Sequence, residues 1–220
     1  MEKPKWSFSA LKQYINCPQN YYRTRVTQEF KTNDTTYTIY GKEVHKVIEN
    51  FLLRNTPIPA HYRDVLQHVP AIAALLPSRR YVEHGMALTL EGLPCAFDGP
   101  DYWVRGIADL LALDDTSAWI IDWKTGSPRY ADTKQLKLMA LLTFAHFPTV
   151  NRVNSLLYFT KDNSQVYAPE FTRYDIDDLW KQFFPDLALL EMSFAYNNWP
   201  MKPSGLCKFC PVSSCAHHRS

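Results

Sequence analysis

The feature that most constrains the fold of this chain is a pair of β-prone segments separated by a short polar turn. The segments are Tyr102–Leu113 and Trp119–Trp123, and Asp114-Asp115-Thr116-Ser117 lies between them. A turn of this length and composition is typical of the connection between antiparallel strands. The two segments therefore predict a β-hairpin.

The register of this hairpin predicts a cluster of charged side chains. If residues 114–117 form the turn, position 113 pairs with position 118, and Asp109 lies directly across from Asp122. Because side chains alternate along a strand, Lys124 shares the face of Asp122. Opposed carboxylates destabilise a sheet unless a counter-charge neutralises them, and a hard divalent cation does so through oxygen ligands. The hairpin predicts half of a magnesium site; the alternative is a pair of solvated aspartates with Lys124 as their ion-pair partner.

A magnesium site of this kind suits phosphodiester hydrolysis. The ion polarises a phosphoryl oxygen and lowers the pKa of a bound water, which then attacks in line. We expect Lys124 to orient that water and to offset the charge that develops on the phosphorus centre.

Hydrophobic periodicity predicts helices and strands on both sides of the hairpin. Helices are expected from Ser9 to about Asn16, over Lys42–Arg54 and His61–Leu76, from Asp132 to about Phe147, and from Asp175 or Asp177 onward with a kink at Pro185. Strands are expected over Tyr81–Leu90 and Arg152–Phe159, and after the turn at residues 161–164. The order strand, helix, strand after the hairpin predicts a crossover onto a parallel neighbour. The expected fold is α/β, a single domain over residues 1–220 with a mixed central β-sheet flanked by helices, residues 81–172 forming the catalytic sheet core.

Composition excludes several classes of protein. With 46% hydrophobic and 21% charged residues, the chain is neither disordered nor fibrous. Its longest apolar run, Leu138–Phe147, falls short of the ~20 residues that span a bilayer, and the N-terminus lacks the apolar core of a signal peptide. We expect a soluble, cytoplasmic protein with no membrane partner.

Three short motifs carry a resemblance to a known family: Gly106-Ile107-Ala108-Asp109, then Ile120-Ile121-Asp122-Trp123-Lys124-Thr125-Gly126, then Gln135-Leu136. Their order and spacing are similar to the core motifs of the PD-(D/E)XK nucleases, and specifically to the RecB-like branch. The upstream sequence Gly41-Lys42-Glu43-Val44-His45 resembles the Gly-x-x-x-His helix of that branch.

The resemblance implies a role for each matching residue. Asp109, Asp122 and His45 would be ligands of Mg²⁺ or Mn²⁺, Lys124 the catalytic lysine, and Gln135 a support for substrate or lysine. The backbone carbonyl of Trp123 would complete the coordination of the metal.

Some of these residues also have plainer interpretations. His45 is consistent with a histidine at the edge of a helical apolar stripe, and Gln135 stands three residues after Asp132, the spacing of a capping box. Glu83 is interpreted as a solvated surface residue rather than an accessory acid. Met139 stands where the family often has Tyr, so the contribution of that Tyr is absent or supplied elsewhere.

Cysteines mark both ends of the chain. Cys207, Cys210 and Cys215 are spaced closely enough to hold three positions of one metal site, and Cys17 precedes Pro18 near the N-terminus. This arrangement resembles the four-cysteine 4Fe-4S staple of the AddB nuclease domain and of CRISPR-associated adaptation nucleases, although the last interval is one residue shorter here. The resemblance implies a structural cluster joining residues 1–31 to residues 200–220. Zinc is the alternative, with His217 or His218 in place of Cys17, and Cys95 is expected to be a buried bystander.

Charge is distributed unevenly along the chain. Residues 1–31 carry six Lys or Arg against Glu2 and Glu29, and residues 200–220 carry Lys202, Lys208 and Arg219 without an acidic residue. Basic ends around an acidic centre suit a protein that binds a polyanion with its ends and cations at its core; the alternative is a chance division of charge in a near-neutral chain. Tyr and Trp residues lie among the N-terminal basic residues, as they often do on base-stacking surfaces, but core packing is the more common use of aromatic side chains.

Together these features predict a metal-dependent deoxyribonuclease. The resemblance implies that it is an exonuclease acting on DNA ends, with a preference for single strands, alone or with a helicase, recombinase or other DNA-processing partner. Two alternatives are a DNA-binding or assembly module that keeps the fold without cleavage, and an endonuclease. The retention of Asp109, Asp122 and Lys124 argues against the first, and the lack of an evident recognition domain argues against the second.

Overall fold

The computed structural model describes residues 3–218, including Tyr130 by its backbone alone. Glu2 and Arg219, which count toward the basic ends, lie outside the described residues. The chain divides into two compact units, the first made of residues 1–34 and 181–220 and the second of residues 35–180. The single domain over residues 1–220 therefore stays a prediction.

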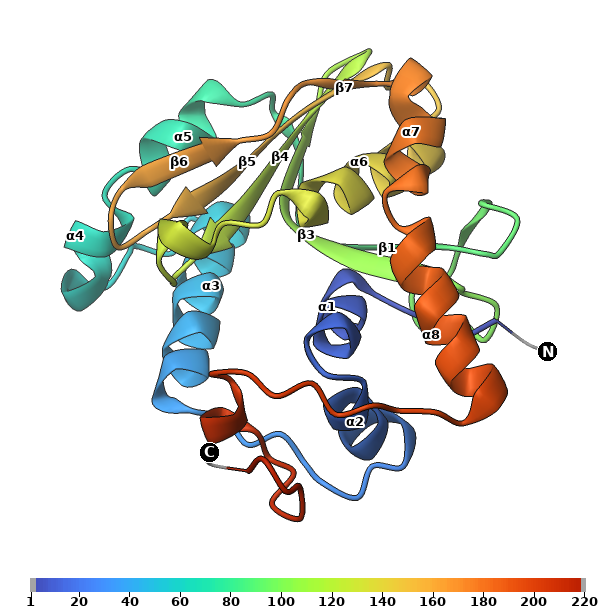
Figure 1. The fold of residues 1–220 in the computed structure, drawn as a ribbon. Coiled ribbons are helices and arrows are strands. Elements are labelled where there is room, and N and C mark those ends of the chain that lie inside the picture. The colour runs from blue at the N-terminus through green and yellow to red at the C-terminus, as the bar shows by residue number, and fades with distance from the viewer. Residues whose placement is uncertain (1–2, 219–220) are drawn as a thin grey trace. The chain divides into compact units, whose positions relative to one another are not determined.

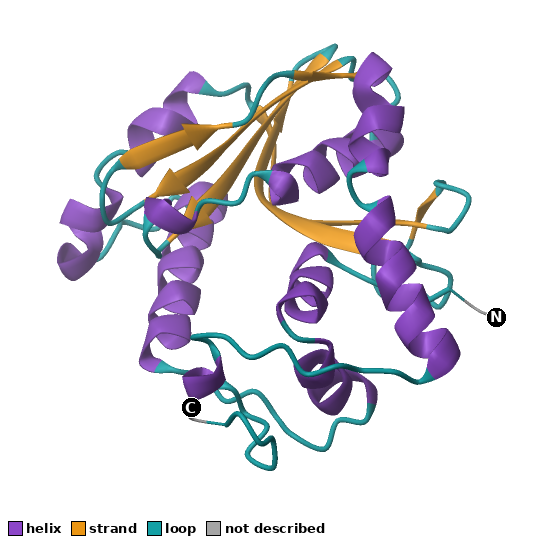
Figure 2. Ribbon diagram, in the orientation of Figure 1, coloured by secondary structure: helices purple, strands orange, loops and turns teal. Residues whose placement is uncertain are grey.

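The second unit is built on a mixed sheet with the strand order β2-β1-β3-β4-β5-β6, in which β7 also pairs with β5 (Figures 1 and 2). β4 and β5 run parallel, and all other neighbours are antiparallel. The expected mixed α/β architecture is confirmed. The strands are β1 Arg79–Leu88, β2 Pro94–Cys95, β3 Val104–Leu113, β4 Ser117–Lys124, β5 Arg152–Phe159, β6 Ser164–Tyr167 and β7 Phe171–Thr172.

The hairpin β3–β4 has the predicted register. Leu113 pairs with Ala118, and the ladder continues to the pair Leu110–Ile121. It stops there, one step before Asp109 and Asp122, because the Asp109 carboxylate accepts the backbone N–H of Trp123 in place of a ladder bond. The two aspartates therefore lie where the strands begin to separate.

Helix α6, Lys134–His146, connects β4 to the parallel strand β5 as expected. It begins two residues after Asp132, whose Oδ1 accepts the N–H of Lys134. At the other end, Arg173 donates to the carbonyls of Phe144 and Phe147, which have no partner within the helix. A short 3₁₀ turn, Pro128–Tyr130, precedes α6.

Helix α3, Thr36–Arg54, begins earlier than the predicted Lys42 because Thr35 and Thr38 form a capping box. Its buried residues Val44 and Ile48 share a core with Ile121 and Trp123 of β4. Asp122, between these two, faces α6 instead, where it binds Gln135. Alternation along β4 thus places α3 and α6 on opposite faces of the sheet.

The single helix predicted over His61–Leu76 is wrong. The segment forms a 3₁₀ turn, Ala60–Tyr62, and two short helices, α4 Arg63–Leu66 and α5 Val69–Leu75. Pro70 lies in the first turn of α5, and because proline lacks an N–H it starts a new helix rather than continuing one. β1 is likewise displaced from the predicted Tyr81–Leu90, since Thr89 and Leu93 close a turn.

The first unit brings both ends of the chain into one core. Helix α1, Phe8–Asn16, is capped by Ser7 rather than the predicted Ser9. The hydroxyl of Tyr14 donates to the carbonyl of Leu189 in α8 at 2.7 Å. The remaining elements are α2 Pro18–Tyr21, a π-helical turn Tyr22–Val26, α8 Phe184–Tyr196 and a 3₁₀ turn Cys207–Phe209.

The long C-terminal helix predicted from Asp175 or Asp177 is divided. A 3₁₀ turn, Arg173–Asp175, leads into α7, Ile176–Lys181, and α8 starts afresh at Phe184 with Pro185 in its first turn. The predicted kink is therefore a complete break. Within residues 3–218, every helix is too short or too polar to cross a membrane.

Candidate active site

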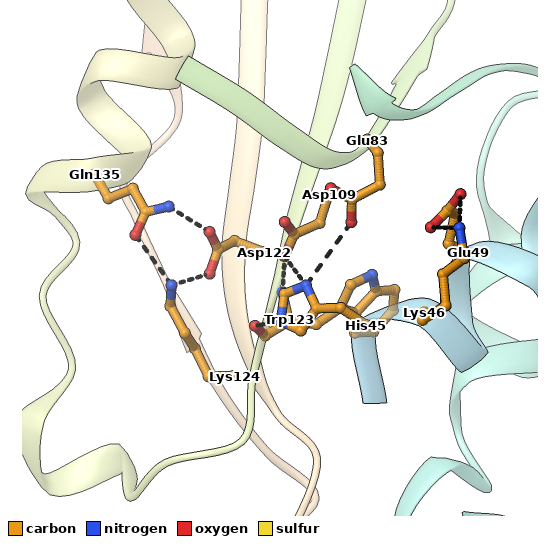
Figure 3. Close-up of polar contacts among 9 residues, drawn as sticks. All are labelled: His45, Lys46, Glu49, Glu83, Asp109, Asp122, Trp123, Lys124 and Gln135. Carbon is orange, nitrogen blue, oxygen red and sulfur yellow. Dashed lines mark hydrogen bonds and ion pairs between the residues drawn. The ribbon is translucent and has the colours of Figure 1, made fainter. Parts of the chain in front are cut away.

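The strand β4 presents Asp122 and Lys124 on one face, as predicted. Asp122 is only 3% exposed, and its Oδ2 lies 2.5 Å from the Lys124 ammonium. Lys124 is half-buried at the strand end, so its charge is held against the carboxylate rather than in solvent. This pair forms the centre of the site in Figure 3.

Gln135, in the first turn of α6, links these two side chains. Its amide nitrogen donates to Asp122 Oδ1 at 2.6 Å, and its amide oxygen accepts from Lys124 Nζ at 3.0 Å (Figure 3). The capping-box interpretation of Gln135 is therefore wrong. Its amide fixes the relative positions of the lysine and the carboxylate.

The peptide group of Trp123 joins Asp122 to the other half of the site. The Trp123 N–H donates to Asp109 Oδ2 at 2.8 Å, and its carbonyl oxygen lies 2.9 Å from His45 Nε2. Because the Trp123 indole is buried in the core with α3, this peptide group is held firmly. His45 lies beside buried Val44 at the edge of the apolar stripe of α3, and its ring also reaches to the point where the β3–β4 ladder stops.

Glu83 is a residue that the sequence interpretation missed. Its Oε1 lies 3.8 Å from His45 Nδ1, and Asp109 Oδ2 lies 3.6 Å from the same nitrogen. Ligand atoms of His45, Glu83 and Asp109 all lie within 4.8 Å of one another. Glu83 is thus exposed, as expected, and also lies at the site; the signal in the sequence was its place on the strand before the hairpin.

Burial and mutual repulsion perturb the carboxylates. Burial, with the charge of Asp122 added, raises the pKa of Asp109 to about 7. Burial also raises the pKa of Asp122, and the adjacent Lys124 only partly opposes it. For His45, burial lowers the pKa, but Glu83 and Asp109 outweigh it and the net shift is upward. The site favours added positive charge.

These donors fit a divalent cation. Carboxylate and carbonyl oxygens suit Mg²⁺ and Mn²⁺, and an imidazole nitrogen is compatible with Mn²⁺. Glu83 and Asp109 lie near His45, and Asp122 pairs with Lys124, so a bound cation would relieve the repulsion among the three carboxylates.

A protein-family model described as the PD-(D/E)XK nuclease superfamily matches residues 5–215. The chain belongs to this superfamily. Its members are metal-dependent nucleases, which agrees with the acidic site and with the arrangement of the sheet. No curated protein matches the chain.

Two solved structures resemble this nuclease. That of SSO0001 has a TM-score of 0.52 at 14% identity, covering 100% of this chain and 90% of that one. A protein from Eubacterium rectale, whose name ascribes exonuclease activity to it, has a TM-score of 0.49 at 10% identity, covering 96% and 94% of the two chains. At this identity the likeness to SSO0001 shows a shared fold alone.

The first unit of this nuclease contains a cavity of about 380 Å³ lined by Cys17, Cys207, Cys210 and Cys215. All four thiols are free and half-buried. Asn20 donates to Cys210 Sγ at 3.0 Å, and the N–H of Ser204 lies 3.4 Å from Cys207 Sγ. Cys95, expected to be buried, is half-buried in β2.

Proposed function

We propose that the protein is a metal-dependent DNA exonuclease of the RecB-like branch that hydrolyses phosphodiester bonds at DNA ends, with a preference for single strands. The observation that carries the nuclease activity is the chain of contacts from Lys124 through Gln135 to Asp122, beside Asp109 and His45. The RecB-like assignment is supported by His45, whose helix carries the Gly-x-x-x-His sequence and whose ring lies at the site.

The cation would be held by His45, Asp109, Asp122 and the carbonyl oxygen of Trp123. When bound, it supplies a Lewis acid for a phosphoryl oxygen and lowers the pKa of the attacking water. Support for the carbonyl comes from its place at the site: its oxygen lies 2.9 Å from His45 Nε2, and the N–H of Trp123 donates to Asp109.

Lys124 would hold the attacking water and stabilise the negative charge that develops on the phosphoryl oxygens. Gln135 accepts one ammonium N–H at 3.0 Å and thereby directs the others. Asp122, bonded to the same glutamine, would remain ionised with the cation in place, because the added positive charge favours its carboxylate form.

We further propose a structural 4Fe-4S cluster bound by Cys17, Cys207, Cys210 and Cys215. Cys17, Cys207, Cys210 and Cys215 line one cavity in the first unit, and all four thiols are free, which supports a ligand shared by the two terminal segments. The resemblance of their spacing to the four-cysteine staple favours an iron-sulfur cluster over zinc.

The substrate proposal rests on the basic ends and on the resemblance. Residues 1–31 and 200–220 carry an excess of Lys and Arg, as a phosphate-binding surface requires. A helicase or recombinase would supply ends or single strands to such an enzyme.

The test is a nuclease assay on anaerobically purified protein, with DNA labelled at the 5′ or the 3′ end, single- or double-stranded, in Mg²⁺, Mn²⁺ or EDTA. Asp122→Asn is compared with Asp115→Asn, a matched change in the exposed turn. We expect cation-dependent shortening from an end, abolished only by Asp122→Asn. Cleavage that survives EDTA or Asp122→Asn would refute the proposed site, and internal cuts would indicate an endonuclease.

A further inference from the structure

Glu83 has a backbone conformation that its strand does not require. Its φ is +50°, in the left-handed region, whereas its neighbours pair regularly with β3 as Val82–Leu110 and His84–Ala108. A residue with a Cβ adopts this conformation at a cost in free energy, and such residues concentrate at functional sites. The distortion occurs at the position of β1 that lies across from Asp109.

The distortion brings a second carboxylate toward His45. Glu83 Oε1 and Asp109 Oδ2 lie 3.8 Å and 3.6 Å from His45 Nδ1, on two sides of the ring edge (Figure 3). Both distances exceed the ~2.7–3.2 Å of a good hydrogen bond. Together with these two distances, all three ligand atoms lie within 4.8 Å of one another, close enough for one cation to bind them all.

The charged groups around His45 also favour a bound cation. The ion pairs of Glu83 and Asp109 are both with His45, whereas Lys124 pairs with Asp122. One imidazole therefore faces two carboxylates from the neighbouring strands β1 and β3, and their repulsion favours added positive charge.

We infer that Glu83 is a direct ligand of the catalytic cation, together with His45 and Asp109. This inference rests on the proposed function and adds a protein ligand to the site described there. The resulting set of one imidazole and two carboxylates suits Mn²⁺ better than a ligand set of oxygens alone would. Cation binding would offset the cost of the left-handed backbone at Glu83.

The test measures Mn²⁺ binding directly, by the electron paramagnetic resonance signal of free Mn²⁺, on the full chain without DNA. Three variants are compared with the wild type. Glu83→Gln keeps the shape of the side chain and removes its charge; Glu83→Gly also removes the backbone strain, because glycine adopts positive φ freely. Glu49→Gln is the matched control, on the helix that carries His45 but paired with Lys46.

We expect the dissociation constant for Mn²⁺ to rise roughly tenfold or more in both Glu83 variants and to stay at the wild-type value in Glu49→Gln. The melting temperature of Glu83→Gly in EDTA should equal or exceed that of the wild type, which separates ligand loss from misfolding. Wild-type affinity in both Glu83 variants would overturn the inference while leaving the proposed nuclease intact. A wild-type protein that neither binds Mn²⁺ nor cleaves DNA would overturn both.

Discussion

The carboxylate of Asp109 accepts the backbone N–H of Trp123 at 2.8 Å, at the point where the β3–β4 ladder ends. This bond replaces the next pair of backbone hydrogen bonds, so the two strands separate without leaving the Trp123 N–H unsatisfied. The separation leaves room for the carboxylates of Asp109 and Asp122 where the ladder stops. An aspartate that we propose as a metal ligand thus also ends the β3–β4 ladder.

The first prediction concerns the stability of the protein without metal as pH changes. Burial, followed by the charge of Asp122, raises the pKa of Asp109 from 3.8 to about 7, so the folded state holds this proton more tightly than the unfolded state does. The contribution of Asp109 to the free energy of unfolding is therefore fully present at low pH, and it is lost as pH rises from about 4 to about 7. In EDTA, the wild type should gain more stability than Asp109→Asn when pH is lowered from about 8 to about 6. Equal pH slopes in thermal melts of the two proteins would contradict the raised pKa.

The second prediction concerns Gln135, which we expect to be a positioning residue. Gln135→Ala should lower kcat roughly 10- to 100-fold, because Lys124 and Asp122 lose the amide that aligns them. Mn²⁺ affinity should change little, since the amide is not a proposed ligand. Gln67→Ala, an exposed change just after α4, serves as the control. A Gln135→Ala protein with normal kcat, or one that loses activity only by losing Mn²⁺, would argue against this role.

The sequence predicted the parts of the site that depend on strand periodicity. The register of β3 and β4 follows from the short turn at residues 114–117, and it placed Asp122 and Lys124 on one face as observed. Alternation is a local property, so a correct turn is sufficient to predict it.

Glu83 could not be predicted in this way. Its participation depends on a left-handed backbone within β1 and on His45, which comes from a helix distant in the sequence. Apolar periodicity also missed two helix breaks, one before Pro185 and one within residues 60–75. Such periodicity continues across a helix break, so it shows which side of the segment is buried but not where the backbone hydrogen bonds stop.

The third prediction concerns the contact between the sheet and α6 behind the site. A Cβ added at Gly106 would lie 2.1 Å from the Met139 methyl and 3.1 Å from Leu142, both buried in α6. Gly106→Ala should therefore destabilise the fold by about 1–3 kcal/mol through overpacking. Gly126→Ala is the matched control, because no atom lies within 4 Å of its added Cβ. Chemical denaturation of both variants checks this; equal loss of stability in the two would show that glycine flexibility, not packing, matters.

The fourth prediction concerns the cysteine-lined cavity. Cys210→Ser should abolish the visible absorbance of the proposed iron-sulfur cluster in anaerobically purified protein and lower its melting temperature. The reason is that a ligand set drawn from residue 17 and residues 207–215 closes a loop of nearly the whole chain, and so restricts the unfolded state strongly. Cys95→Ser, in β2, should leave both the absorbance and the iron content unchanged. A colourless wild-type protein with one zinc ion per chain would replace the cluster with a zinc site. Full colour and unchanged melting in Cys210→Ser would refute the ligand set.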